Sequence, residues 1–315
     1  MSGEHETFHA RTVAAPAEAV YGLVADVTRW PVLFGPSVHV EHLERGPDTE
    51  RFRLWARVGD EVVSWTSRRW LDRSARRIRF EQEHSTPPVA AMGGEWQIGA
   101  GPDGSTEVVL RHRFRAVDDD PAAVDLILAA LDRNSGDELG ALARIAEAGA
   151  PVDRLVLGFE DVVALPVGPT GAYAFVDRAD RWPDRLEHVG RVALTEIGPG
   201  VQDMEMDTVT AGGHTHTTRS VRLCFRERNL IVYKQLVPPA LLFGHSGSWS
   251  FAAAEGGGTR VTARHLVAVD PGAVERVLGP GTTLDDARTY LRDALGANSR
   301  ATLAAAGAPA EGAAP

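Results

Sequence analysis

The 315-residue chain has very little cysteine, no excess of basic residues and no long apolar run. Its single cysteine, Cys224, excludes a disulfide framework and a cysteine-built metal site. The formal net charge of -10 argues against a nucleic-acid-binding protein, since such proteins usually carry a basic excess. The N-terminus also lacks the basic and apolar regions of a signal peptide. These absences predict a cytoplasmic protein with no membrane and no nucleic-acid partner.

The chain instead contains alternating segments typical of short strands, followed by a long helical segment. Gly-, Pro- and Asp-rich clusters separate the strands and predict hairpin turns. After Asp120-Pro121, apolar residues recur at helical spacing as far as Ile145. The first half therefore predicts a strand, two short helices, a run of antiparallel strands and one long helix. We expect strands at residues 9–14, 38–43, 50–58, 61–71, 77–83, 94–98 and 106–116.

The second half repeats this order closely enough to indicate a tandem duplication. Rare residues match in order, at an offset that stays nearly constant until the last helix, before which the second copy has extra residues. We expect one domain at residues 1–151, a second at 152–303, and a disordered tail at 304–315. The matched pairs are Trp30 and Trp182, Ser67 and Ser220, Arg69 and Arg222, Phe80 and Tyr233, Trp96 and Trp249, His112 and His265, and Asn134 and Asn298.

Each half predicts an α+β arrangement in which a curved antiparallel sheet wraps around the long C-terminal helix and leaves an internal pocket. Alternate residues of a strand share a face, so Trp65, Ser67 and Arg69 point the same way. Turned inward, this face lines the pocket; turned outward, it belongs to an ordinary solvated strand. Aromatic rings beside an arginine and a hydroxyl suit a flat, oxygen-rich ligand. The other lining residues expected are Phe80, Trp96 and, at the mouth, Trp30.

Three motifs resemble those of the polyketide aromatase/cyclases of the helix-grip (START or Bet v 1-like) superfamily: Trp-Thr-Ser-Arg-Arg at 65–69, Asp-x-x-x-Trp-Pro at 26–31 and Gly-Gly-Glu-Trp at 93–96. With its duplication, the chain resembles the di-domain aromatase/cyclases of bacterial type II polyketide synthases. That resemblance implies that a poly-β-ketone, bound to an acyl carrier protein and already ketoreduced, undergoes C7–C12 aldol closure and dehydration. It implies no cofactor.

The same resemblance implies which residues act. Arg69 is the expected oxyanion partner because it stays protonated, and Ser67 orients a carbonyl or a water. Their copies Arg222 and Ser220 are expected to be catalytic as well. The plain alternative is that the hydroxyl is satisfied within the sheet and the aromatic residues are core. Expected substrate-binding residues are Trp30, Phe34, Trp65, Phe80, Trp96, His112, Asn134, Trp182, Tyr233, Trp249 and His265.

No general base stands out in the sequence. His112 lies between two arginines whose side chains share the opposite face, so it could face inward and titrate near neutral pH. A structural histidine is nevertheless the favoured interpretation, for His112 and for its copy His265. Asn134 either reaches into the pocket or stays exposed on the helix. His214 and His216 have the spacing of a metal pair on a strand, but no third ligand accompanies them, so no metal is expected.

The two halves are not identical, and the differences suggest a division of labour. Thr218 replaces Trp65, and Leu186 replaces Phe34. We therefore expect the first domain to close the ring and the second to assist in folding, dehydration or docking. One hairpin of this acidic protein carries many arginines, which either receive an acidic carrier protein or solvate an exposed sheet face. They are Arg68, Arg73, Arg76, Arg77 and Arg79.

Two other functions remain open at this point. One is a non-catalytic carrier of lipid or polyketide that uses the same pocket, and the other is a duplicated stress or hormone-binding helix-grip protein. A concentrated polar cluster in the pocket would favour the enzyme, and the repeated Ser-x-Arg pattern supports that expectation.

Overall fold

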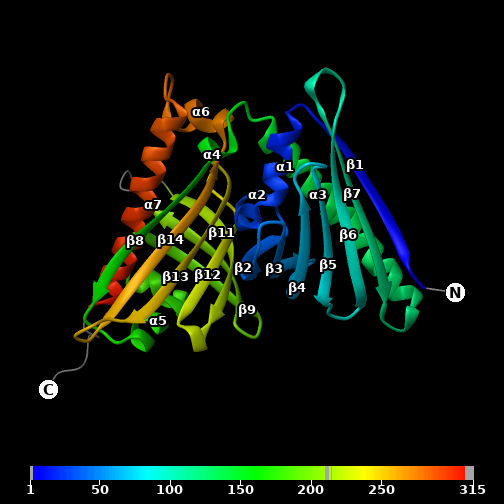
Figure 1. Ribbon diagram of the computed structural model, residues 1–315. Coiled ribbons are helices and arrows are strands. Elements are labelled where there is room, and N and C mark those ends of the chain that lie inside the picture. Colours follow the sequence, from blue (N-terminus) through cyan, green and yellow to red (C-terminus); the bar gives the residue numbers. More distant parts are fainter. Residues whose placement is uncertain (1–2, 210–212, 214, 309–315) are drawn as a thin grey trace. The chain divides into compact units, whose positions relative to one another are not determined.

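The computed structural model describes residues 3–209, 213 and 215–308, which divide into two compact units between Arg154 and Leu155. Each unit contains one seven-stranded sheet in which all neighbouring strands run antiparallel. A long helix near the end of each unit accompanies the sheet (Figure 1). The predicted α+β helix-grip fold is therefore confirmed for both halves of the chain.

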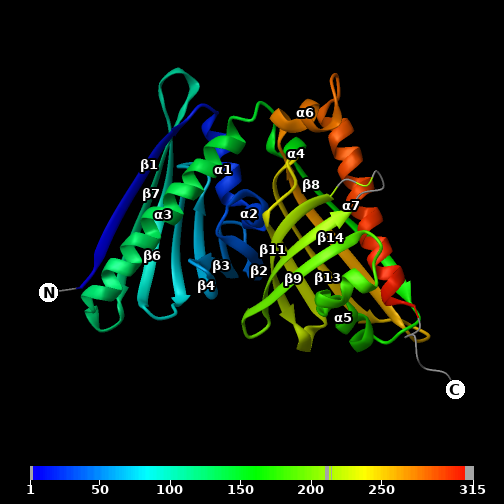
Figure 2. The same ribbon diagram turned by 180° about the vertical axis from the view of Figure 1, so that it is seen from behind.

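In the first unit the strand order is β1-β7-β6-β5-β4-β3-β2, and α3 lies across one face of the sheet (Figure 2). The elements are β1 (His5–Val13), α1 (Ala17–Ala25), η1 (Val27–Arg29), α2 (Trp30–Leu33), β2 (Ser37–Arg45), β3 (Thr49–Val58), β4 (Glu61–Asp72), β5 (Arg77–His84), β6 (Val89–Ala100), η2 (Pro102–Gly104), β7 (Thr106–Ala116), η3 (Val117–Asp119) and α3 (Pro121–Ala146).

The sequence determines where α3 begins and which side it buries. The Asp120 side chain accepts a hydrogen bond from the Ala122 amide at 3.1 Å, and Pro121 occupies the first turn, where no amide hydrogen is needed. Apolar residues at helical spacing then form a stripe that is buried against the sheet. That stripe consists of Val124, Ile127, Leu131, Leu139, Leu142 and Ile145.

The second unit repeats this topology, with the order β8-β14-β13-β12-β11-β10-β9. The extra residues before its last helix include the short helix α6, and a capping box between Thr283 and Asp286 begins α7. The elements are α4 (Val152–Leu155), β8 (Val156–Leu165), α5 (Pro169–Asp177), η4 (Ala179–Asp184), β9 (Val189–Gly198), β10 (Val201–Val209), β11 (Thr215–Phe225), η5 (Arg226–Arg228), β12 (Leu230–Val237), β13 (Leu242–Ala253), β14 (Thr259–Val269), η6 (Pro271–Ala273), α6 (Val274–Leu278) and α7 (Leu284–Ala306).

The register places matched residues at equivalent positions in the two sheets. Phe80 lies opposite Gly94, which lies opposite His112 on the next strand. In the same way Tyr233 lies opposite Gly247, which lies opposite His265. A Cβ on Gly94 would lie 2.5 Å from the Phe80 ring, and one on Gly247 would lie 2.3 Å from the Tyr233 hydroxyl. Glycine is therefore required there so that the aromatic ring can lie over the neighbouring strand.

Several boundaries differ from those expected. β1 begins at His5 rather than at residue 9, and β6 begins at Val89 rather than at residue 94, because pairing with β7 extends both strands beyond their β-branched segments. The tail expected from Ala304 begins later, since α7 continues to Ala306; residues 309–315 lie outside the described part of the chain. No helix in the described residues is long and apolar enough to span a membrane.

Candidate active site

A cavity of about 440 Å³ lies between the sheet and α3 in the first unit. Most of its lining is apolar, and a few polar side chains converge on it, as in ordinary small-molecule sites. Its lining includes the β3–β4 turn at Gly59, the β5–β6 loop at Pro88, and the α3 residue Leu126, which is 66% exposed. These three segments mark the mouth, because there the lining reaches the protein surface.

The structure brings most of the expected first-unit residues to this cavity. Ser67 and Arg69 on β4 are buried, whereas Trp65 on the same face is only half-buried. Phe34 is not among the lining residues; it is buried and packs edge-on against Trp30, with the ring centroids 5.5 Å apart. The expected residues that line the cavity are Trp30, Trp65, Ser67, Arg69, Phe80, Trp96, His112 and Asn134.

Arg69 is engaged by protein groups to an extent that the sequence did not suggest. Its side chain is 1% exposed, and it donates to Glu50, to the Val24 carbonyl at 2.9 Å and to the Ala25 carbonyl at 2.6 Å. Nε and Nη2 both donate to Glu50 Oε1. Burial lowers the pKa of Arg69, and the charge of Glu50 opposes that shift. Four of the five N–H groups are used in these bonds, which leaves one on Nη1 for a ligand.

The indole ring of Trp30 packs against the guanidinium of this arginine. Its indole Nε1 donates to the Val24 carbonyl at 3.2 Å, and the Arg69 guanidinium carbon lies 5.0 Å from its ring centroid. Arg69 and Trp30 therefore both bind the carbonyl of Val24 near the end of α1. This arrangement fixes the position of the tryptophan ring on the cavity wall.

Glu138 also lines the cavity, although the sequence interpretation overlooked it. It lies one helical turn after Asn134 on α3, so both side chains project from one face of the helix. Burial first, and the nearby charge of Asp137 second, raise the pKa of Glu138 to about 7. No cation among the described residues forms an ion pair with this carboxyl. A carboxylic acid that titrates near neutral pH in a cavity can serve as a general base or acid.

His112 is the second acid–base group in the cavity. Burial, and to a lesser extent the charge of His9, lowers its pKa to about 4, so the imidazole is neutral at physiological pH. Its Nδ1 atom is buried and has no hydrogen-bond partner among the described residues. The imidazole packs edge-on against the Phe80 ring at 5.5 Å. A neutral imidazole of this kind can donate or accept a hydrogen bond from a bound ligand.

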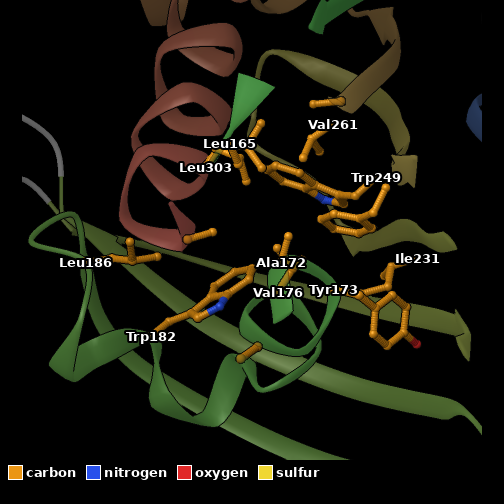
Figure 3. Close-up of a cluster of buried hydrophobic side chains, with 14 of the residues drawn as sticks. Leu165, Ala172, Tyr173, Val176, Trp182, Leu186, Ile231, Trp249, Val261 and Leu303 are labelled. Carbon is orange, nitrogen blue, oxygen red and sulfur yellow. The ribbon is translucent and has the colours of Figure 1, made fainter. Parts of the chain in front are cut away.

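The equivalent residues of the second unit have different surroundings. Trp182 and Trp249 are buried in a hydrophobic cluster together with Tyr173 and Leu303, as Figure 3 shows. Trp182 Nε1 donates to the Phe175 carbonyl at 3.2 Å, which reproduces the bond of Trp30. Tyr233 and His265 instead belong to a buried polar cluster on β12, β13 and β14. Ser220, like Ser67, is buried on its strand.

Arg222 matches Arg69 in burial but differs in its partner. It donates to Gln202 at 2.7 Å and to the Val176 carbonyl at 2.6 Å. Gln202 lies opposite Arg222 in the sheet, as Glu50 lies opposite Arg69. The carboxylate that neutralises the buried arginine of the first unit is therefore an amide in the second.

The remaining expected groups lie away from the cavity. No metal-binding cluster of His, Cys, Asp or Glu occurs in the described part of the chain; His216 is exposed on β11, and His214 lies outside that part. Asn298 is exposed on α7. In the arginine-rich hairpin, Arg68 pairs with Glu83 at 2.9 Å, and Arg76 donates to the Ile98 carbonyl at 3.3 Å. Arg73, Arg77 and Arg79 are exposed.

Comparison with known sequences identifies the family. A family described as "Polyketide cyclase / dehydrase and lipid transport" matches residues 5–147. The actinorhodin polyketide synthase bifunctional cyclase/dehydratase of Streptomyces coelicolor is 55% identical over 98% of this chain and 98% of its own. The granaticin polyketide synthase bifunctional cyclase/dehydratase of Streptomyces violaceoruber is 55% identical over 95% of this chain and 92% of its own. The chain belongs to the polyketide cyclase/dehydratase family.

Solved structures agree with this assignment across both units. The di-domain ARO/CYC BexL from the BE-7585A biosynthetic pathway is 45% identical, with a TM-score of 0.80 over 99% of this chain and 100% of its own. The di-domain ARO/CYC StfQ from the steffimycin biosynthetic pathway is 38% identical, with a TM-score of 0.76 over 96% of this chain and 97% of its own. The predicted membership among di-domain aromatase/cyclases is confirmed, and the enzyme interpretation is favoured over a carrier.

Proposed function

We propose that this enzyme closes the first ring of an acyl-carrier-bound, ketoreduced poly-β-ketone by an aldol reaction and then promotes its dehydration. The observation that carries the proposal is the first-unit cavity, where Glu138 and His112 meet Ser67 and Arg69 among aromatic side chains. Aldol closure needs a base, stabilisation of an enolate, and two carbons held close together. Each need has a matching group in the lining.

Glu138 is the base in this mechanism. Its carboxylate removes a proton from a methylene between two carbonyl groups, and the resulting acid returns a proton to the alkoxide that forms on ring closure. A pKa of about 7 suits both steps, because the group is partly ionised at the working pH. Burial is the main cause of that raised pKa, and the nearby charge of Asp137 adds to it.

The enolate oxygen is stabilised by donors on other walls of the cavity. Ser67 and the remaining Nη1 hydrogen of Arg69 come from β4, and an N–H of neutral His112 comes from β7. Because Arg69 is neutralised by Glu50, its contribution is a directed hydrogen bond more than a free positive charge. Arg69 was expected to be the main oxyanion partner. In this mechanism it has only one N–H left to donate to the enolate oxygen.

The shape of the cavity supplies the third requirement. Trp65 and Trp96 offer flat surfaces, and Phe80 lies over Gly94 beside His112. A flexible poly-β-ketone confined among these rings loses the conformers that would lead to other rings, which can contribute several kcal/mol to the rate. The same walls exclude water from the reactive enolate.

The carrier protein, in this proposal, docks at the mouth rather than on the arginine-rich hairpin. The hairpin connects β4 to β5, at the opposite end of β4 from the mouth residue Gly59. At about 3.3 Å per residue, the 12 residues of β4 separate the two ends by roughly 35–40 Å. Arg133 lies on α3 at the mouth, is exposed, and has no ion-pair partner among the described residues. We propose that Arg133 binds the phosphate of the carrier's arm and that this docking occurs in the cytoplasm.

The test is reconstitution of the full-length protein with a minimal polyketide synthase and a ketoreductase. Products formed with and without this protein are compared by mass and by ring pattern. We expect a single first-ring regiochemistry and aromatic products only when the protein is present. An unchanged mixture of products would overturn the proposed function and favour a carrier.

A further inference from the structure

A buried polar cluster in the second unit has no part in the mechanism above. The Tyr233 hydroxyl lies 3.0 Å from His265 Nδ1 and 3.3 Å from His245 Nε2, and these two nitrogens lie 3.1 Å apart. The three atoms thus form a triangle of mutual hydrogen-bond contacts, which we call the Tyr-His-His triangle. The imidazoles are stacked with an interplanar angle of 27° and are 3% and 5% exposed.

Outer partners orient both imidazoles. Gln235 Oε1 lies 3.0 Å from His245 Nδ1, so that nitrogen carries a hydrogen and Nε2 is left as an acceptor. Ser299 Oγ on α7 lies 2.7 Å from His265 Nε2. Burial lowers the pKa of both histidines, to about 4 for His265, and raises that of Tyr233. The groups of the triangle are therefore neutral. They carry fewer polar hydrogens than the triangle has hydrogen-bond contacts, so a hydrogen can pass among its three atoms.

The first unit shows that the fold does not require this cluster. At the positions of Tyr233 and His245 the first unit has Phe80 and Met92, while His112 and Ser135 match His265 and Ser299. The same sheet thus forms with an apolar pair there. Burying two further polar side chains has an energetic cost that a purely structural role would not need. This contrast points to a chemical role for the triangle.

Access to the triangle is through the tyrosine. Tyr233 packs against the interior cluster of the second unit and bonds His265, which in turn contacts α7. Its side chain therefore lies on the helix-facing side of the sheet. Unlike the two imidazoles, it is only half-buried. A bound molecule would meet a phenol O–H that is backed by two neutral imidazole nitrogens.

We infer that Tyr233, His245 and His265 form a second acid–base site, which removes water from the β-hydroxy ketone left by aldol closure; this rests on the proposed function. A neutral imidazole nitrogen takes the proton of the Tyr233 hydroxyl, and the phenol oxygen in turn takes the proton from the carbon next to the carbonyl. Tyr233 gives its proton to the departing hydroxyl, the C–O bond breaks, a C=C bond forms and water leaves. The tyrosinate then recovers a proton from the imidazolium 3.0–3.3 Å away, which restores the triangle.

The test uses Tyr233→Phe and His245→Met in the full chain, because each installs the residue that the first unit already has at that position. Tyr173→Phe is the matched control, since it removes another buried phenol hydroxyl of the same unit, away from the triangle. Product masses are followed in time with the reconstituted synthase, and water loss measured without enzyme is subtracted. Thermal unfolding of each variant verifies its fold.

We expect first-ring closure at the wild-type rate and a ratio of hydrated to dehydrated ring that rises roughly tenfold or more in both triangle variants. Tyr173→Phe should leave this ratio unchanged. A wild-type ratio in both folded triangle variants would overturn the inference, and so would an equal loss of ring closure and water loss. A wild-type protein with no effect on products would instead overturn the proposed function itself. If one triangle variant fails to fold, the product ratio of the other variant decides the test.

Discussion

The carboxylates of Glu50, which is buried, and Glu138, which is half-buried at the cavity, have different neighbours and therefore different roles. Glu50 accepts hydrogen bonds from Arg69 and contacts His42 Nε2 at 2.8 Å, so its charge is matched by partners. Glu138 faces the cavity with no ion-pair partner in the described residues, and its pKa rises to about 7. The paired carboxylate stabilises the wall, while the unpaired one is available for chemistry.

Glu138→Gln tests the catalytic role directly. In the wild type, ring closure should accelerate as the pH rises through about 7, because the ionised carboxylate is the base. The variant should be slower by roughly 10²–10⁴-fold and should lose this pH dependence. Single-turnover product formation on both sides of pH 7 measures both effects. A variant with the wild-type pH profile would exclude Glu138 as the base.

The same substitution should have a pH-dependent effect on folding. The folded state holds the Glu138 proton up to a pKa of about 7, whereas the unfolded state releases it near the ordinary value of 4.5. The stability of the wild type therefore falls as the pH rises between these two values, and the glutamine variant is free of that loss. Denaturant unfolding should show that Glu138→Gln gains stability relative to wild type across this window. A constant difference between the two proteins would contradict the raised pKa.

Glu50→Ala should be strongly destabilising, because it leaves Arg69 buried without its carboxylate. We expect a loss of about 3–5 kcal/mol in the free energy of unfolding, measured by denaturant titration. Glu50→Gln should lose less, since Gln202 already binds the buried Arg222 at 2.7 Å in the second unit. Equal stability of Glu50→Ala and wild type would mean that the ion pair contributes nothing.

At the scale of elements, strands β6 and β13 each shape the interior through a glycine, which has no side chain. Gly94 and Gly247 leave room for Phe80 and Tyr233, so the aromatic ring on the preceding strand lies beside the histidine of the following strand. One strand position without a side chain thus brings two functional side chains together. The arrangement occurs in both units, although the chemistry of the aromatic residue differs.

Gly94→Ala and Gly247→Ala should each destabilise their unit by about 1–3 kcal/mol, the usual range for overpacking. The new Cβ would lie 2.1 Å from the Arg111 carbonyl oxygen in one case and 2.4 Å from the Arg264 carbonyl oxygen in the other. Gly99→Ala is the control on β6, because its Cβ would have no neighbour closer than 4.0 Å. Thermal unfolding measures all three, and a loss in Gly99→Ala equal to that in Gly94→Ala would exclude the steric explanation.

At the scale of the whole molecule, the two duplicated units share one fold but have different residues in their interiors. The first unit has the apolar cavity with Glu138, and the second has Thr302 at the matching helix position and the Tyr-His-His triangle on its sheet. The buried arginine persists in both, bound to the end of the preceding helix in each case. The shared fold therefore fixes the arginine, and the interior of each unit sets its own chemistry.

Carrier docking is the prediction at this scale. Arg133→Ala should weaken binding of the acyl carrier protein and reduce the salt dependence of binding, because it removes the exposed cation at the mouth. Arg77→Ala, which removes an exposed cation from the hairpin at the far end of β4, should change neither. Titration calorimetry at two salt concentrations compares them. A larger effect of Arg77→Ala would restore the hairpin as the docking surface.

Site residues that are repeated in both halves could be predicted from the sequence, whereas some of those that occur in only one half were missed. The duplicated Ser-x-Arg strand, Trp30 and Trp96 could be recognised because each has a counterpart in the second half. Glu138 could not, since its counterpart is Thr302 and a lone glutamate on a helix resembles a solvated residue. Glu50 could have been found: a two-residue turn at Gly59-Asp60 places residue 50 opposite residue 69. Burial and pKa depend on packing, which the strand pattern alone does not supply.

The solitary cysteine of this chain has a practical consequence for following the reaction. Cys224 is half-buried on β11, and burial raises the pKa of its thiol to about 12, so little thiolate forms near neutral pH. A thiol introduced by Leu126→Cys would lie at the exposed rim of the cavity and would react first with a maleimide dye. The natural protein is therefore ready for site-selective fluorescent labelling at the entrance, with no need to remove its own cysteine.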